Sequence, residues 1–175
     1  MNGARFGGDL ERGAKLKIMK IKDKNKLSGR YRFKVYKAGT RDLIRITPWI
    51  KNLIVKNANS GVNIAIKNLL GDFTYTLEIT NAKIGTGTTA AADCDTDLET
   101  AVLSDIKVMD ADETDLDEAT FLFFIADAEL PDDDYTEFGL FCGTRLFARS
   151  IITPTFSKGA NEDIECEYVI TSSNS

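Results

Sequence analysis

The sequence predicts a mainly β protein: an antiparallel, β-sandwich-like domain with one short α-helix and an extended N-terminal arm. Several short segments place apolar residues at every second position, and turn-forming residues separate these segments. One segment, at about residues 60–70, instead spaces its apolar residues as a helix with one buried face does. The chain has 175 residues, of which 43% are hydrophobic and 28% charged, which suits a single compact domain.

Five segments carry the strand prediction. Residues 30–36, 73–80 and 164–170 alternate apolar and polar side chains, which is typical of a strand with one buried face. Residues 120–126 form an apolar run, which favours a strand covered on both faces. Residues 138–152 hold two apolar segments around a Cys-Gly-Thr turn, and this arrangement predicts a hairpin.

The helix prediction rests on spacing and on end signals. The apolar positions follow the i, i+3, i+4, i+7, i+8 pattern of a buried helix face: Val62, Ala65, Ile66, Leu69 and Leu70. Asn59 or Ser60 is expected to cap the N-terminus, and Gly71 is placed where a glycine commonly follows a helix. Apolar residues at alternate positions from Val62 to Ile66 leave a strand as the alternative.

The net charge of −5 hides a strong asymmetry along the chain. Residues 1–57 hold 16 Lys or Arg and 4 Asp or Glu, a net charge of +12, whereas residues 58–175 hold 6 and 23, a net charge of −17. Such asymmetry indicates an electrostatic contact with an oppositely charged surface. We therefore divide the chain into a basic extended arm, residues 1–29, and a single β-rich domain, residues 30–175.

The predicted contact joins the basic arm of one copy to an acidic surface of another. Residues 93–134 hold 16 Asp or Glu and a single lysine, and so many like charges are unfavourable without counter-charge. The basic residues assigned to this contact are Lys15, Lys17, Lys20, Lys22, Arg30, Arg32 and Lys34. The acidic residues are Asp93, Asp95, Asp97, Asp110, Asp112, Asp115 and Asp117. Nucleic acid is not favoured as the partner, because the arm has no interleaved aromatic residues and no binding motif.

No catalytic, metal or cofactor site is expected. The chain contains no histidine, which removes the commonest general base near neutral pH. Cys142 and Cys166 are expected to be buried free thiols, with a disulfide between them as the alternative. The turn at 85–90 lacks the lysine of a phosphate-binding loop, and the carboxylates at 93–99 lack the glycine and glutamate spacing of a calcium loop.

The chain also lacks membrane signals. No apolar run approaches the roughly 20 residues that cross a bilayer, and the first ten residues contain no apolar stretch of signal-peptide type. A membrane is therefore not expected as a partner, and assembly in a cytoplasm is expected.

Three stretches resemble a known group of proteins. They are KNLIVKNANSGVNIAIKNLLGD at 51–72, KIGTGTTAAADCDTDLETAV at 83–102, and FGLFCGTRLFARSIITPTFSKGANEDIECEYVITSS at 138–173. Together they resemble small structural proteins of tailed bacteriophages, and they are similar to the N-terminal attachment modules of tail-collar and tail-fibre proteins. In that group a helix leads to a GTGTTA turn, and a strand pair with the pattern E.GLF…LFAR completes the sheet.

This resemblance implies a structural subunit of a virion, assembled in the host cytoplasm. The expected partners are other virion proteins and further copies of the chain, in a homo-oligomer. The tail, collar, baseplate and fibre-attachment region are the expected locations, and capsid decoration is an alternative. A receptor- or carbohydrate-binding module at a fibre tip is another alternative, which would use exposed aromatic residues such as Trp49, Tyr75 or Tyr135. An enzyme is not expected, because no carboxylate pair stands out among so many.

Overall fold

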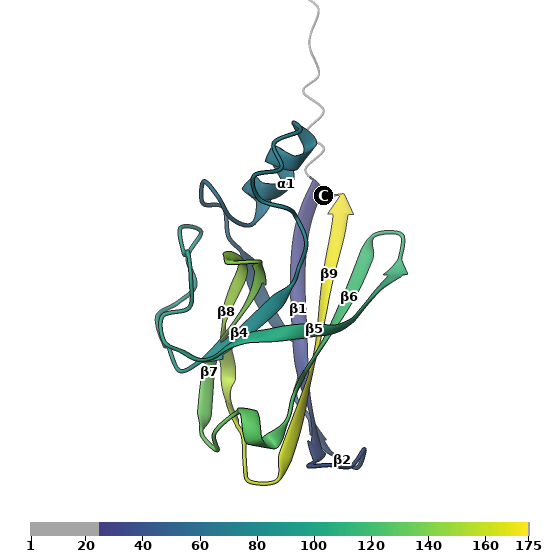
Figure 1. Cartoon of the computed structure of the whole chain (residues 1–175), viewed down its shortest axis with the longest axis vertical. Coiled ribbons are helices and arrows are strands. Elements are labelled where there is room, and N and C mark those ends of the chain that lie inside the picture. Colours follow the sequence, from purple (N-terminus) through teal and green to yellow (C-terminus); the bar gives the residue numbers. More distant parts are fainter. Residues whose placement is uncertain (1–24, 175) are drawn as a thin grey trace, which may run out of the picture.

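A computed structural model describes residues 25–174 (Figure 1). It confirms a mainly β, antiparallel fold with one short helix. In chain order the elements of this part are β1 (Asn25–Lys37), β2 (Leu43–Ile46), β3 (Ile50–Ile54), α1 (Val62–Leu69), β4 (Asn81–Gly85), β5 (Ala101–Asp115), β6 (Glu118–Ile125), the 3-10 turn η1 (Asp127–Glu129), β7 (Asp134–Cys142), β8 (Arg145–Ser157) and β9 (Glu162–Asn174).

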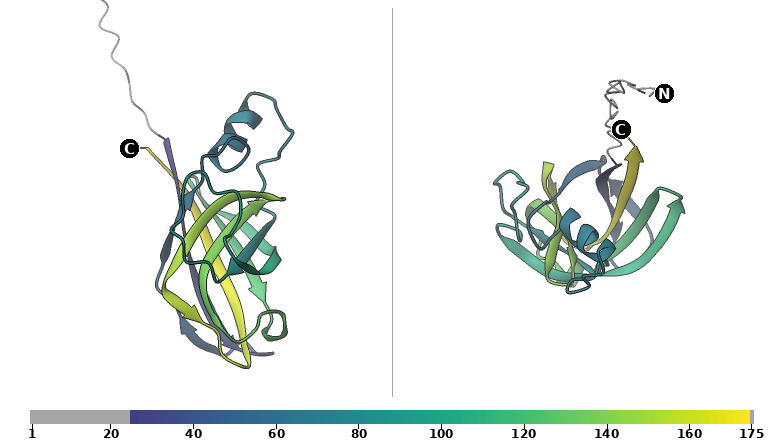
Figure 2. Two further views of the ribbon diagram at one scale, coloured as in Figure 1. Left: turned by 90° about the vertical axis from the view of Figure 1, so that its left-hand side faces the viewer. Right: turned by 90° about the horizontal axis from the view of Figure 1, so that it is seen from above.

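The architecture is a closed barrel of eight antiparallel strands and not the expected sandwich (Figure 2). Neighbouring strands follow the order β1-β3-β8-β7-β4-β5-β6-β9, and β9 pairs with β1 along its whole length. The first and last strands are each 13 residues long, so their pairing closes the wall. Strand β2 pairs with the same edge of β1 as β3 does, farther along β1. Alternating apolar positions are common to sandwiches and barrels, so the sequence pattern did not distinguish them.

The start of β1 differs from the predicted boundary between arm and domain. Residues 25–29, which were assigned to the arm, belong to β1 and pair with the end of β9. The remaining arm residues, including Lys15, Lys17, Lys20 and Lys22, lie outside the described residues.

Aromatic rings fill the barrel interior. Six rings of the main core cluster are those of Tyr31, Phe33, Phe123, Phe138, Phe156 and Tyr168. The Tyr31 and Phe138 ring centroids lie 4.9 Å apart, and those of Phe33 and Phe156 lie 4.4 Å apart. The Tyr31 hydroxyl is 2.7 Å from the Ser150 hydroxyl, which satisfies it in a site where burial raises the tyrosine pKa.

Helix α1 ends as predicted but begins differently. Gly71 has a positive φ of 81°, and the Gly71 and Asp72 amides donate to the carbonyls of Asn68 and Lys67, as a glycine-terminated helix requires. The expected side-chain cap from Asn59 or Ser60 is wrong: Gly61 occupies the cap position, without a side-chain hydrogen bond. A Cβ at Gly61 would lie 1.9 Å from the Val55 carbonyl oxygen, so the close approach of two backbone segments requires glycine.

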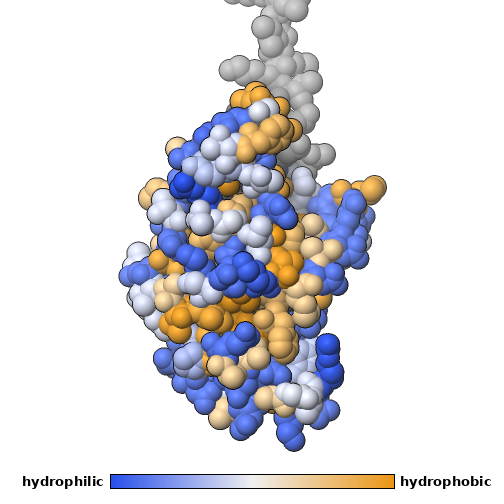
Figure 3. Space-filling view, viewed as in Figure 1, coloured by the Kyte–Doolittle hydropathy of each residue, from blue (hydrophilic) through white to orange (hydrophobic). Residues whose placement is uncertain are grey.

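The predicted buried face of α1 is also wrong. Ile64 alone is fully buried among the helix residues, whereas Leu69 and Leu70 are 83% and 81% exposed. The helix lies above one end of the barrel (Figures 1 and 2), so only the turn nearest the barrel, which holds Ile64, is buried against the core. Apolar surface is consequently visible over the helix in Figure 3.

The strand expected at 73–80 is absent. Its backbone bonds instead to the side chain of Asn68, which donates to the Tyr75 carbonyl and accepts from the Leu77 amide. The next strand is β4, which starts at Asn81. Among the helices of residues 25–174, none is long and apolar enough to span a bilayer.

Candidate functional site

Glu137 is a completely buried carboxylate in the barrel wall. It lies on β7 between Thr136 and Phe138, and Arg149 lies on the adjacent strand β8 opposite Gly139. The guanidinium donates to Glu137 Oε2 from Nε at 3.0 Å and from Nη2 at 2.9 Å. Because removal of a carboxylate from water costs several kcal/mol, such a residue persists only with a nearby cation and further hydrogen-bond donors.

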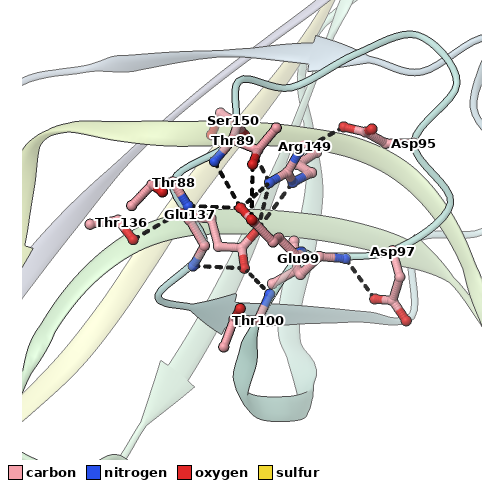
Figure 4. Close-up of polar contacts among 12 residues, drawn as sticks. Thr88, Thr89, Asp95, Asp97, Glu99, Thr100, Thr136, Glu137, Arg149 and Ser150 are labelled. Carbon is pink, nitrogen blue, oxygen red and sulfur yellow. Dashed lines mark hydrogen bonds and ion pairs between the residues drawn. The ribbon is translucent and has the colours of Figure 1, made fainter.

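The further donors are backbone amides of the segment between β4 and β5 (Figure 4). Glu137 Oε1 accepts from Gly87 N at 3.1 Å and from Thr100 N at 2.7 Å, and Oε2 accepts from Glu99 N at 3.0 Å. We call residues 86–100 the clamped loop, and Glu137 with Arg149 the clamp. Five donors therefore converge on one carboxylate, and three of them fix the two ends of the loop.

Arg149 and Glu99 hold the middle of the clamped loop. Arg149 donates to Asp95 Oδ2 at 2.8 Å and to the Thr89 carbonyl at 3.0 Å. Burial lowers the pKa of Arg149, but the bonds to Asp95 and Glu137 outweigh it and the net shift is upward. The Glu99 carboxylate accepts from the Thr89 and Thr88 amides at 2.8 Å, and the Thr89 bond is the main reason that the pKa of Glu99 is lowered.

The glycines of the GTGTTA turn are needed for close packing. A Cβ on Gly85 would lie 2.1 Å from the Thr100 carbonyl oxygen, and one on Gly87 would lie 2.5 Å from Glu137 Oε1. The Gly87 amide donates to the Glu137 carboxylate, and the Thr88 and Thr89 amides donate to the Glu99 carboxylate. The turn is thus part of the scaffold, in agreement with its interpretation as a turn leaving a strand.

Three of the predicted acidic contact residues lie in the clamped loop and have partners within the chain. Asp95 bonds to Arg149, and both oxygens of Asp97 accept from Lys83 Nζ, at 2.7 and 2.9 Å. Asp93 is exposed and lies 3.3 Å from Lys56 Nζ. The acids of this loop consequently serve its internal structure.

The described basic contact residues also have partners within the chain. On the wall formed by β1 and β9, Arg32 lies 2.8 Å from Glu167, and Lys34 lies 3.0 Å from Glu165. Arg30 lies 3.6 Å from Glu118. These three residues therefore neutralise acids of their own barrel, and only the arm lysines, outside the described residues, remain as basic contact candidates.

The other acidic contact residues occupy the β5–β6 hairpin. Asp110, Asp112, Asp115 and Asp117 are exposed, and none has a Lys or Arg within 4 Å among residues 25–174. No cluster of metal-ligating side chains occurs in this part of the chain either. The hairpin is thus the region of the described structure where predicted acidic contact residues remain uncompensated.

The two buried cysteines, and the three aromatic residues considered for a binding surface, belong neither to the clamp nor to the hairpin. Cys142 and Cys166 are buried and free, as predicted, and burial raises the pKa of Cys142 to about 11. The expectation that Tyr135 is exposed is wrong: it is completely buried in the core, and its hydroxyl donates to the Pro131 carbonyl at 2.7 Å. Trp49 stacks against the guanidinium groups of Arg30 and Arg32, and Tyr75 against that of Arg145.

A search of protein-family models found no match, and searches of curated proteins and of solved structures found none either.

The clamp was not predicted, although the sequence holds a signal for it. Arg149 is a charge between apolar residues of one predicted strand, Glu137 directly precedes the other, and the expected hairpin would place the two near each other. A charge within an apolar strand requires a partner. The bonds to the loop amides could not be foreseen, because they depend on the path of a segment about 40–50 residues away in sequence.

We expect Arg149→Met to destabilise the fold by about 3–5 kcal/mol, because it leaves Glu137 buried without its cation. Urea unfolding followed by circular dichroism measures this change. Arg41→Met, which removes the same charge from the exposed turn after β1, is the control and should cost less than about 0.5 kcal/mol. Equal stability of the two variants would contradict the role of the clamp.

Proposed function

We propose that this chain is a non-catalytic structural subunit of a tailed-phage virion, and that it assembles with its own copies and other virion proteins. The contact is electrostatic: the basic arm of one copy binds an acidic surface of a neighbour. The resemblance of residues 51–72, 83–102 and 138–173 to tail-collar and tail-fibre attachment modules supports the virion setting. A tail, collar, baseplate or fibre-attachment position is favoured, with capsid decoration as the alternative.

The β5–β6 hairpin is the observation that carries the assembly part of the proposal. Every side chain from Met109 to Asp117 is exposed, so neither face of this part of β5 is covered by the rest of the barrel. The hairpin extends along one side of the molecule (Figures 1 and 2). A two-stranded ribbon that buries little of itself gains stability when a partner covers it.

The ion pairs within the chain reduce the number of charged residues that are free to form the proposed contact. Acids in the clamped loop and bases on β1 already have partners, so their charges are largely balanced within the chain. The acids of the hairpin and the arm lysines are the remaining complementary groups. The proposed contact therefore joins residues 15–22 of one copy to residues 110–117 of another.

The clamp supports a scaffold role for the motifs that carry the resemblance. The GTGTTA turn, the glutamate before GLF and the arginine of LFAR all belong to the clamp or its loop. Their hydrogen-bonding groups are used within the chain. Amides of the loop are thus occupied by Glu99 and Glu137 and are not free to bind a ligand. Such internal bonding is what we expect of a motif that serves the scaffold of a virion protein.

We expect the full chain to self-associate at low salt and to dissociate as NaCl rises from about 0.05 M to about 0.5 M, because exposed ion pairs are screened. Sedimentation velocity at several salt concentrations measures this dependence. Association that strengthens with salt would contradict a charge-driven contact and would indicate an apolar one.

Immunogold labelling of intact phage particles with an antibody against the chain tests the virion assignment. Gold at a fixed position on the particle is the expected result. Labelling of free protein alone, with particles unlabelled, would contradict it.

A further inference from the structure

Strand β5 continues beyond its neighbour in the barrel wall. Its pairing with β4 ends at Lys107, which lies opposite Asn81, whereas β5 itself runs on to Asp115. On its other side β6 pairs with β5 as far as Asp115. From Met109 to Asp115, one edge of β5 therefore has no strand partner within the described part of the chain; we call this stretch the free edge.

The backbone of the free edge is available for pairing. The Ala111 amide donates to the carboxylate of its neighbour Asp110 at 2.9 Å, a local bond that an incoming strand would replace. An unpaired strand edge presents alternating donors and acceptors, which makes it a template for an added strand. The edge is seven residues long, which is enough for an ordinary strand.

We propose that the free edge binds residues 15–22 of a second copy as an added β-strand. This proposal rests on the proposed function and identifies the surface and the binding mode. The segment Lys15-Leu-Lys-Ile-Met-Lys-Ile-Lys22 holds four lysines, two β-branched isoleucines and no glycine or proline. Its charge complements Asp110, Asp112, Glu113 and Asp115, for which the described residues supply no cation within 4 Å.

The apolar side chains of the segment also have a surface to cover. Met109, at one end of the free edge, is 51% exposed, and Leu116, in the turn that follows its other end, is 96% exposed. An added strand with leucine, isoleucine and methionine would bury them, which a purely electrostatic contact would not do.

Chain geometry assigns the segment to a second copy. In the wall, β9 and β6 separate β1 from β5. A strand added beyond β5 would lie about 19 Å from β1 along the wall, at about 4.8 Å per strand spacing. The three residue links from Lys22 to Asn25 span at most about 11 Å. The segment therefore cannot occupy the free edge of its own copy while β1 is formed.

Charge-reversed full-length variants test the proposal by sedimentation velocity at low salt. The edge variant carries Asp110→Lys, Asp112→Lys and Asp115→Lys; the arm variant carries Lys15→Glu, Lys17→Glu, Lys20→Glu and Lys22→Glu. A control with Asp42→Lys, Glu78→Lys and Asp133→Lys makes the same charge change as the edge variant at exposed acids outside the clamped loop and the hairpin. All substituted positions in the described structure are exposed, so folding should be retained, which circular dichroism verifies.

The edge and arm variants should each associate at least about tenfold more weakly than the wild type, and the control should not. An equimolar mixture of the two variants should associate again, since each arm then meets an edge of opposite charge. If the arm variant alone loses association, the arm binds an acidic surface other than residues 110–117, and charge-driven assembly through the arm stands without the free edge. Undiminished association of the arm variant would overturn both the arm contact and the free-edge proposal, and failure of the mixture would overturn the arm-to-edge contact.

Strand addition has its own test. Ile18→Pro keeps every charge but prevents continuous strand pairing, and Ile18→Thr is the matched control with a strand-compatible residue. Ile18→Pro should weaken association at least about tenfold relative to Ile18→Thr. Hydrogen exchange at Met109–Asp115 should slow on association of the wild type. Equal association of the two variants, or unchanged exchange, would overturn strand addition.

Discussion

The buried carboxylate of Glu137 is the constraint on which the arrangement around β7, β8 and the β4–β5 connection depends. A carboxylate at this position is stable only when the Arg149 guanidinium and the three loop amides reach it together. Each requirement restricts the sequence. Arg149 must lie on the adjacent strand, and Gly85 and Gly87 must lack side chains for the loop to approach. The 15 residues of the clamped loop are thereby fixed to the wall despite having no strand of their own.

The clamp also separates two roles for the many acids of this chain. Acids between 93 and 99 neutralise Arg149, Lys83 and Lys56 or accept loop amides, so they stabilise the monomer. Acids between 110 and 117 lie beyond the point where β5 leaves β4, where the barrel offers no counter-charge among its described residues. Asp105, with a positive φ of 71°, lies just before that point. The acidic residues that look alike in the sequence therefore fall into two groups: those before β5 form ion pairs and hydrogen bonds within the monomer, and those of the β5–β6 hairpin are exposed.

Local patterns predicted much of the fold. The alternation in 30–36 and 164–170, the apolar run at 120–126 and the glycine after α1 correspond to β1, β9, β6 and the helix end. These features follow from nearest-neighbour chemistry. Closure of the barrel did not follow, because it depends on pairing between the first and last strands of the described chain. Two further differences also depend on tertiary structure. The apolar face of α1 is exposed because the helix lies above the barrel end. Residues 73–80 form no strand, and their backbone bonds to the side chain of Asn68.

The site was predicted less well than the fold. Charge counting located both groups of acids but could not separate paired from unpaired ones, because Lys83 and Arg149 reach the first group only through the fold. Glu137 lies one residue before the apolar segment that was expected to start at Phe138, so the strand prediction did not include it. The free edge of β5 had no sequence signal, since nothing local indicates that β4 starts only at Asn81, opposite Lys107, while β5 continues to Asp115.

Native-state hydrogen exchange of the Gly87, Glu99 and Thr100 amides tests the central role of the clamp most directly. These amides lie in a loop, and loop amides ordinarily exchange through local fluctuations. If Glu137 fixes the loop to the barrel, all three should exchange as slowly as the amides of β7 and β8. Exchange at the rate of unprotected loop amides, with β7 and β8 still protected, would show that the loop opens independently and would contradict the account.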